Sequence, residues 1–378
     1  MLSIWEKESF YKPVDVIIIG SGLMGLWTAY ELKERTPDLD ILILERSSIP
    51  TGASTRNAGF ACFGSVTELL HNAEIMGAEE MLKTVQARYK GMQKIRRVLG
   101  DEKVGFEDCG GHECINSDYK HYSQLADKVK WLNDLLEPIT KDKHSFILNN
   151  KKLATTGLTD FDALIETRYE GALHSGKLVQ SLMQLAVEKG VQIMTGQAVA
   201  NWEQTAINIR VYCQQHCFDT KKLLIATNGF TTQLLPAAKV EPARGQVIVT
   251  KPIDGLKLFG TFHFDEGFYY WRHLGNRVLL GGARNLAINE ERTQTLETSI
   301  AIQKELERFL LTHILKDYAL DPINLIEYRW AGLMGFTEDR KPQVIQVDKN
   351  IWSAICCNGM GVALAPIVAE EVAIAMLQ

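Results

Sequence analysis

The sequence lacks the motifs of several common protein classes. None of its seven cysteines forms a CxxC pair, and it contains no HExxH sequence, Walker lysine or Ser-His-Asp signature. The sequence therefore gives no support for assigning the protein to the zinc fingers, metalloproteases, P-loop nucleotidases or serine hydrolases. Lysine and arginine form no block and the net charge is −5, which gives no electrostatic footprint for nucleic acid. We expect neither a nucleic-acid partner nor a metal site.

Two short stretches place a histidine between two cysteines. They contain Cys109, His112 and Cys114 in the first case, and Cys213, His216 and Cys217 in the second. Neither stretch has zinc-site spacing or a matching second pair. We therefore interpret the cysteines as reduced, structural residues.

Long apolar runs are also missing. The best candidate, residues 351–377, is interrupted by Asn358, Pro366, Glu370 and Glu371, whereas a membrane helix needs about 20 mostly apolar residues. The first ten residues lack the basic and apolar regions of a signal peptide. We expect a cytoplasmic protein without membrane association. With 378 residues, 46% of them hydrophobic, the chain is long enough for two domains.

The clearest positive feature is a glycine-rich turn near the N-terminus. A β-branched run over residues 14–19 ends in Gly20-x-Gly22-x-x-Gly25, and residues 23–35 predict a helix. The first glycine permits the tight turn, the second the close approach of a phosphate, and the third the packing of helix on strand. A pyrophosphate would then lie at the positive end of the helix dipole. The alternative is a merely structural glycine turn.

An acidic residue completes this pattern. A second predicted strand, residues 41–44, leads to Glu45, twenty residues beyond Gly25. A carboxylate at this position accepts hydrogen bonds from the ribose hydroxyls of an adenosine. The same carboxylate would repel the 2′-phosphate of NADP. We predict an adenine dinucleotide other than NADP.

Three further small-residue segments favour close approach of the backbone to a ligand. The loop 51–60 can bring amides and an arginine to a diphosphate or a flavin edge, although a plain surface loop is the alternative. The turn 226–229 follows a buried strand. The segment 358–363 opens the last helix, where the dipole can hold the negative charge of a reduced flavin.

The predicted elements indicate an α/β protein, α+β overall. We expect a Rossmann-like nucleotide-binding domain that is discontinuous in sequence, and a second domain with an antiparallel sheet over residues 240–282. We also predict two helices over residues 67–99 and one over 293–314. The expected domains are 1–95, 153–232 and 325–378 for the nucleotide, and 96–152 and 233–324 for the substrate.

With these pieces in order, the sequence resembles the FAD-dependent oxidoreductases of the D-amino-acid oxidase superfamily, such as glycine oxidase, sarcosine oxidase and gamma-glutamylputrescine oxidase. The resemblance runs from Asp15 to Ala373. It rests on GSGLMG with Glu45, GASTRNAGF, GALHSGKLV, LLIATNG, EPARGQV, RVLLGGAR, WAGLMGFTEDRKP and CNGMGVALAP.

The resemblance implies bound FAD and oxidation of the C–N bond of a small-molecule amine or amino acid, with hydride transfer to flavin N5 and oxygen or another electron acceptor. The alternatives are a 2-hydroxy-acid dehydrogenase and a non-catalytic flavoprotein module. The cofactor-binding residues it implies are Gly20, Ser21, Gly22, Leu23, Met24, Gly25, Glu45, Arg46, Ser54, Thr55, Arg56, Asn57, Ala58, Gly59, Val199, Ala226, Thr227, Gly229, Gly332, Asn358, Gly359, Met360, Gly361, Val362 and Ala363.

The sequence departs from these relatives at three positions. Met334 occupies the position of the arginine that clamps the substrate carboxylate in glycine oxidase-like members. Gly332 aligns with the cysteine that tethers the flavin in sarcosine oxidase, so we expect non-covalent FAD. Leu279 falls where sarcosine oxidase-like members carry a lysine for oxygen activation. We therefore favour a longer apolar or secondary amine, whose carboxylate, if any, lies away from the flavin.

Candidate substrate residues come from the strand 268–273 and its neighbours. Side chains alternate along a strand, so Tyr270 and Arg272 share one face while Tyr269 and Trp271 share the other. The sequence does not say which face lines the site. Arg272, His273 and Arg284 are candidates for holding an anionic or polar substrate, or equally for salt bridges and core support. We interpret His263 as structural. The predicted substrate-pocket residues are Tyr270, Arg272, Arg284 and Met334.

Overall fold

The computed structural model describes residues 2–355 and 357–378, which form two compact units. The first unit contains the segments up to Thr55, Gly176–Ala243, and from Met334 onward. The second contains Arg56–Ser175 and Arg244–Leu333. The mixed α/β class with a discontinuous Rossmann-like part is thereby confirmed.

The first unit is built on a mainly parallel sheet. Its strands lie in the order β17-β18-β11-β1-β2-β8, and β10 and β9 extend it from β11 as an antiparallel ribbon. The segment from β18 to β8 is parallel throughout. The strands are β1 (Val14–Ile19), β2 (Ile41–Leu44), β8 (Gln192–Met194), β9 (Val199–Gln204), β10 (Ile209–Cys213), β11 (Cys217–Ile225), β17 (Gln343–Asp348) and β18 (Ile351–Ile355).

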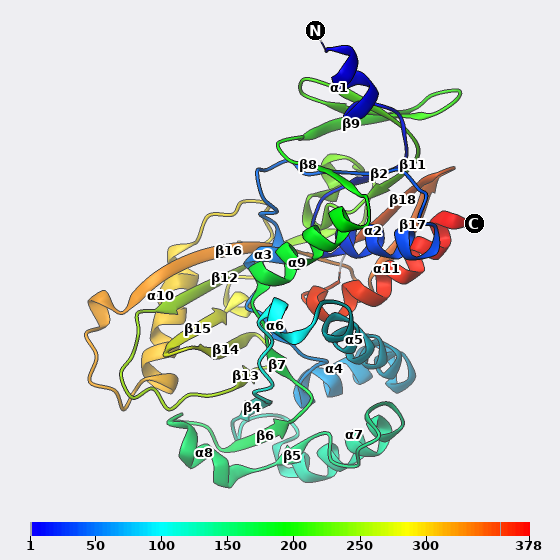
Figure 1. The fold of residues 1–378 in the computed structure, drawn as a ribbon. Helices are drawn as coiled ribbons and strands as arrows, with labels where there is room; N and C mark the ends of the chain where they lie inside the picture. The colour runs from blue at the N-terminus through cyan, green and yellow to red at the C-terminus, as the bar shows by residue number, and fades with distance from the viewer. Residues whose placement is uncertain (1, 356) are drawn as a thin grey trace. The chain divides into compact units, whose positions relative to one another are not determined.

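Burial explains why the sequences of β1 and β2 are almost continuously apolar. In both strands nearly every side chain is buried, because helices cover a parallel sheet. The helices α2 (Leu23–Arg35) and α11 (Gly361–Leu377) pack against each other (Figure 1). The remaining helices around this unit are α1 (Ile4–Ser9), α3 (Ala53–Arg56), α9 (Ser175–Glu188) and the 3₁₀ segment η2 (Asn228–Gln233).

The second unit is built on a mostly antiparallel sheet in the order β16-β12-β15-β14-β13-β4-β6-β5, in which β13 and β4 are parallel. Its strands are β4 (Gly111–Ile115), β5 (Ile147–Leu148), β6 (Ala163–Thr167), β12 (Glu241–Thr250), β13 (Thr261–Phe264), β14 (Tyr269–Leu274), β15 (Arg277–Gly282) and β16 (Ile326–Phe336), whose last residues belong to the first unit. A separate pair joins β3 (Phe60–Ala61) to β7 (Gly171–Ala172).

The helices of the second unit include the predicted pair that breaks at Gly77. The α-helices are α4 (Val66–Met76), α5 (Ala78–Leu99), α6 (Asp101–Val104), α7 (Leu125–Thr140), α8 (Asn150–Thr156) and α10 (Ile300–Phe309). The other turns are η1 (Tyr122–Gln124), η3 (Arg284–Leu286), η5 (Pro322–Asn324) and a π-helical turn, η4 (Leu310–Ile314). The helix expected from residue 293 begins only at Ile300, because residues 293–299 are held in an extended loop by the contacts described below.

The two units divide the chain differently from the expected domains. Residues 56–95, 153–175 and 325–333 fall in the second unit, and residues 233–243 fall in the first. The strand β3 pairs with β7, and the helices α4 and α5 continue from β3. Helical periodicity identifies a helix but not the sheet on which it packs. Which unit binds FAD and which binds substrate stays a prediction. Among the described residues, no helix is long and apolar enough to cross a membrane.

Candidate flavin and substrate site

The turn after β1 requires glycine at two positions. Gly20 has a φ of +105°, and a Cβ atom built on it would lie 2.8 Å from the carbonyl oxygen of Ala226. A Cβ on Gly25 would lie 2.1 Å from the carbonyl oxygen of Gly20. The chain therefore bends sharply at Gly20, and α2 approaches the turn too closely for any side chain at Gly25.

The N-terminus of α2 has the features of an anion site. Leu23 N–H donates a hydrogen bond to Ser54 Oγ at 2.9 Å, which places the loop after β2 beside the helix start. A Cβ on Gly22 would lie 2.9 Å from that same Oγ. The first turn carries no acidic side chain, so the positive end of the dipole is not neutralised by the helix itself.

Glu45 lies at the end of β2 and ties the glycine turn to the second strand. Its Oε2 accepts hydrogen bonds from the backbone N–H of Ser21 at 3.1 Å and from its hydroxyl at 2.8 Å. Its Oε1 accepts one from Ser47 N–H at 3.2 Å. A carboxylate has about four acceptor positions, so this buried group keeps capacity for a ribose hydroxyl. The residues of the turn therefore fit a dinucleotide.

Other predicted cofactor residues of the first unit gather near this turn. Ala226 N–H donates to Ile19 O at 3.0 Å, which continues the pairing of β11 with β1. Thr227 lies next to Gly20. The guanidinium of Arg46 lies 3.8 Å from the centre of the Phe230 ring, in a cation–π contact. Val199 starts β9, two residues after Gln197, whose N–H donates to Glu45 O.

The second glycine-rich segment forms a strained turn before α11. Asn358 and Gly359 have φ values of 49° and 84°, and the helix begins at Gly361. Asn358 Oδ1 accepts a hydrogen bond from Thr337 N–H at 2.9 Å, which joins this turn to the chain just after β16. A Cβ on Gly359 would lie 3.7 Å from the sulfur of Met334. Met334 is thus a neighbour of the predicted flavin-binding turn.

Within the second unit, the predicted loop residue Arg56 contacts the middle of β16. Its Nη1 donates to Ala331 O at 2.9 Å, and Trp330 Nε1 donates to Arg56 O at 2.9 Å. A Cβ on Gly332 would lie 3.1 Å from Arg56 Cβ. Gly332 therefore leaves room for the close passage of this loop.

Asn57 and Gly59 shape the rest of the loop. Asn57 Oδ1 accepts hydrogen bonds from Gly59 N–H at 2.9 Å and from the hydroxyl of Ser175 at 2.7 Å. Gly59 has a φ of +73°, and a Cβ there would lie 2.2 Å from Leu173 O. Ala58 is buried with Val247, Val249 and Leu279.

The two faces of β14 have different surroundings. Tyr269 stacks on Phe309 of α10 with ring centroids 4.3 Å apart, and Trp271 is completely buried in the same core. The opposite face carries Tyr270 and Arg272, which lie beside Gly281 and Leu279 of β15. Because α10 covers the first face, only the Tyr270 face remains as a candidate for substrate contact.

Arg272 bonds to the backbone through Nη1, while its buried Nε has no hydrogen-bond partner among the described residues. Only 4% of it is exposed, and its Nη1 donates to Gly59 O at 2.9 Å and Leu173 O at 3.1 Å. Burial lowers the pKa of its guanidinium from the ordinary value. This arginine supports the loop that follows Asn57, and neither of these two bonds reaches toward a substrate.

Tyr270 and Arg284 are two further predicted substrate-pocket residues of this unit. The Tyr270 ring packs edge-on against Phe60 and would touch any Cβ on Gly281. Burial raises the pKa of Tyr270 to about 12, opposed by the positive charge of Arg284. The phenol therefore stays protonated at neutral pH and is able to donate a hydrogen bond.

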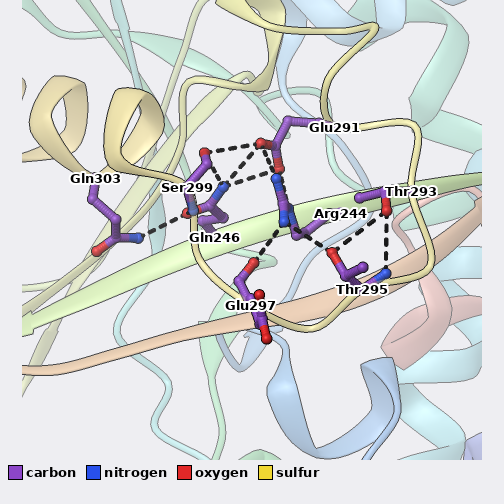
Figure 2. Close-up of polar contacts among 8 residues, drawn as sticks. All are labelled: Arg244, Gln246, Glu291, Thr293, Thr295, Glu297, Ser299 and Gln303. Atoms are coloured by element: carbon purple, nitrogen blue, oxygen red, sulfur yellow. Dashed lines mark hydrogen bonds and ion pairs between the residues drawn. The ribbon is translucent and has the colours of Figure 1, made fainter.

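A buried polar network fixes the segment after Arg284, as Figure 2 shows. Arg244 of β12 donates to both carboxylate oxygens of Glu291 at 2.7 Å and to Glu297 O at 2.6 Å. Gln246, two residues along the strand, donates to Glu291 at 3.0 Å. The remaining members are Thr293, Thr295, Ser299 and Gln303. No motif of the sequence indicated this network.

Fold and turn geometry together define a protein of the dinucleotide-binding α/β class. The model of the DAO family, described as FAD dependent oxidoreductase, matches residues 15–374. The chain therefore belongs to this family and is an FAD-dependent oxidoreductase with FAD as its cofactor.

Two curated relatives cover nearly the whole chain. The chain is similar to a probable oxidoreductase, OrdL, from Haemophilus influenzae, with 23% identity over 97% of this chain and 83% of the relative. It is also similar to gamma-glutamylputrescine oxidoreductase from Escherichia coli, with 24% identity over 95% of this chain and 82% of the relative.

Solved structures share the fold at low sequence identity. L-proline dehydrogenase from P. horikoshii has a TM-score of 0.76 and 17% identity, over 96% of this chain and 93% of that one. Glycine oxidase from Geobacillus kaustophilus has a TM-score of 0.72 and 18% identity, over 97% and 95%.

Proposed function

We propose that this enzyme oxidises the C–N bond of an amine or amino acid. Support comes from the family and from relatives whose names include gamma-glutamylputrescine oxidoreductase and glycine oxidase. FAD, when bound, accepts a hydride from the carbon next to nitrogen, and the resulting imine is hydrolysed by water. The protein supplies binding, orientation and exclusion of solvent.

The cofactor-holding roles follow from local geometry. Glu45 would accept the ribose hydroxyls, and the α2 N-terminus with Ser54 would hold the pyrophosphate. The turn at Asn358 and Gly359 would stabilise the reduced ring through the α11 dipole. Attachment is non-covalent, because Gly332 offers no thiol.

The observation that carries the substrate proposal is that Nη1 of Arg272 donates to two backbone carbonyls. Met334 offers no charge where related enzymes carry an arginine, so this position supplies no cation for a substrate carboxylate. An unpaired buried carboxylate costs several kcal/mol. The substrate is therefore an amine whose carboxylate, if present, lies elsewhere, with Arg284 as the remaining candidate to bind it.

The reaction does not require a strong base from the protein. An amine that enters as the free base needs only correct placement of its C–H bond. Tyr270, with its high pKa, acts as a hydrogen-bond donor that orients the substrate and not as a base at neutral pH.

An anaerobic screen tests this function. The holoenzyme is mixed with separate pools of secondary amines, amino acids and 2-hydroxy acids, and the loss of the flavin absorption band is followed. We expect an amine without a nearby carboxylate to reduce the flavin at sub-millimolar concentration. Reduction by 2-hydroxy acids alone would instead identify a hydroxy-acid dehydrogenase, and no reduction by any pool would indicate a non-catalytic flavoprotein.

The same screen distinguishes the role of Arg284 from that of Arg272. If an anionic amine is a substrate, Arg284→Ala should raise its KM by a larger factor than the KM of a neutral amine. Arg272→Ala should instead lower stability and FAD retention, because it removes the support of the loop at Gly59. A selective KM effect in Arg272→Ala would contradict this assignment.

A further inference from the structure

Three chemically different side chains meet in the interior of the second unit. Cys62 follows β3, Glu170 precedes β7, and His263 lies on β13. A ligand atom from each lies within 4.8 Å of the other two, and His263 Nε2 is 3.2 Å from Glu170 Oε2. Their exposed fractions are 5%, 1% and 9%. Cysteine, histidine and glutamate together form a possible ligand set for a transition metal.

A second observation points to a ligand at this place. Glu170 Oε1 is buried and has no hydrogen-bond partner among the described residues, which is costly for a carboxylate unless something else binds it. A cavity of about 10 Å³ adjoins it, lined in part by Glu170, His263, Glu113 and Ser65. This volume has room for about one water molecule.

The backbone makes space for this carboxylate. A Cβ built on Gly111 would lie 2.1 Å from Glu170 Oε2 and 2.8 Å from Glu170 Cβ. The glycine at the start of β4 therefore allows Glu170 to point at His263. This arrangement brings together residues 62, 170 and 263 from three separate segments, so no motif spacing in the sequence could reveal it.

We propose that Cys62, Glu170 and His263 bind one divalent transition-metal ion, with zinc as the best match. Thiolate and imidazole ligands favour zinc or cobalt over magnesium or calcium. One thiolate and one carboxylate balance the charge of the ion, so the complex buries no net charge. Cys62 loses its proton when the ion binds.

The coordination has an open position. Three protein ligands leave the fourth tetrahedral site for a water molecule, and the adjoining cavity can hold one. The presence of this metal site does not depend on the proposed amine oxidation, although His263 pairs with Tyr270 across β13 and β14.

Zinc binding to the FAD-loaded protein tests the proposal. The protein is treated with a chelator, exchanged into clean buffer, supplied with one equivalent of Zn²⁺ and desalted, and its zinc content is measured by elemental analysis. We expect about one zinc per chain, at least tenfold less in Cys62→Ala and Glu170→Gln, and full retention in Cys114→Ala. Cys114 is the matched control because it is also a buried thiol of the same unit and lies outside the cluster.

X-ray absorption at the zinc edge supplies a readout that needs no variant. The wild-type protein should show one sulfur ligand with nitrogen or oxygen ligands completing the shell. This measurement decides the matter even if Cys62→Ala does not fold. Failure of the wild type to retain zinc, a zinc shell without sulfur, or unchanged retention in a folded Cys62→Ala protein would each overturn the proposal.

Discussion

Arg244 and Glu291 form a two-point ion pair in the second unit, with both N···O distances at 2.7 Å. Only 8% of Arg244 and 1% of Glu291 are exposed. Removing one partner leaves a buried charge without compensation, so Glu291→Ala should destabilise the protein by roughly 3 to 5 kcal/mol. Urea denaturation followed by tryptophan fluorescence measures this loss.

A matched exposed pair provides the control. Arg96 and Asp101 also form two hydrogen bonds, but their side chains are 41% and 45% exposed. Asp101→Ala should therefore cost less than about 1 kcal/mol. Equal losses in the two variants would show that Arg244 and Glu291 do not form a stabilising pair in the folded protein.

The glycine turn gives a prediction about cofactor retention. A side chain at Gly22 would displace Ser54 Oγ from the α2 N-terminus, where the pyrophosphate is expected, so Gly22→Val should copurify with little FAD. Ala206 is exposed in the turn between β9 and β10, outside the predicted cofactor segments, so Ala206→Val is the control. Full FAD occupancy in Gly22→Val would contradict the site assignment.

The mode of FAD attachment is tested by acid precipitation. Gly332 provides no nucleophile at the position of the sarcosine oxidase tether, so the flavin should pass entirely into the supernatant. Yellow colour that remains with the protein pellet would show a covalent bond elsewhere in the chain.

Because His112 is buried, we predict that the protein loses stability in acid. Burial lowers its pKa from 6.5 to about 4. Between these values the unfolded chain binds a proton that the folded chain does not, so stability falls as the pH decreases from 6.5 to 4, by on the order of 3 kcal/mol.

A substitution of His112 measures its contribution to the pH dependence of stability. His112→Gln should flatten the decrease in the urea midpoint over this pH range. The exposed His144 serves as the control, and His144→Gln should leave the profile unchanged. An unaltered slope in His112→Gln would assign the acid sensitivity to other groups.

The parts of the fold that depend on local spacing could be predicted from the sequence. The glycines of the first turn and Glu45 lie within one βαβ unit, and the parallel sheet explains the apolar runs of β1 and β2. The partners of Arg272 could not be predicted, because Gly59 and Leu173 lie 213 and 99 residues away. The same limit applies to the cluster of Cys62, Glu170 and His263. Tertiary contacts, not periodicity, decide which arginine binds the backbone.

The most direct test of C–N oxidation is product analysis of a single anaerobic turnover with an amine that bleaches the flavin. For each FAD reduced, we predict one carbonyl compound and one released amine or ammonia, as hydrolysis of an imine requires. Flavin reduction without C–N cleavage, or reduction by a 2-hydroxy acid and by no amine, would contradict the account.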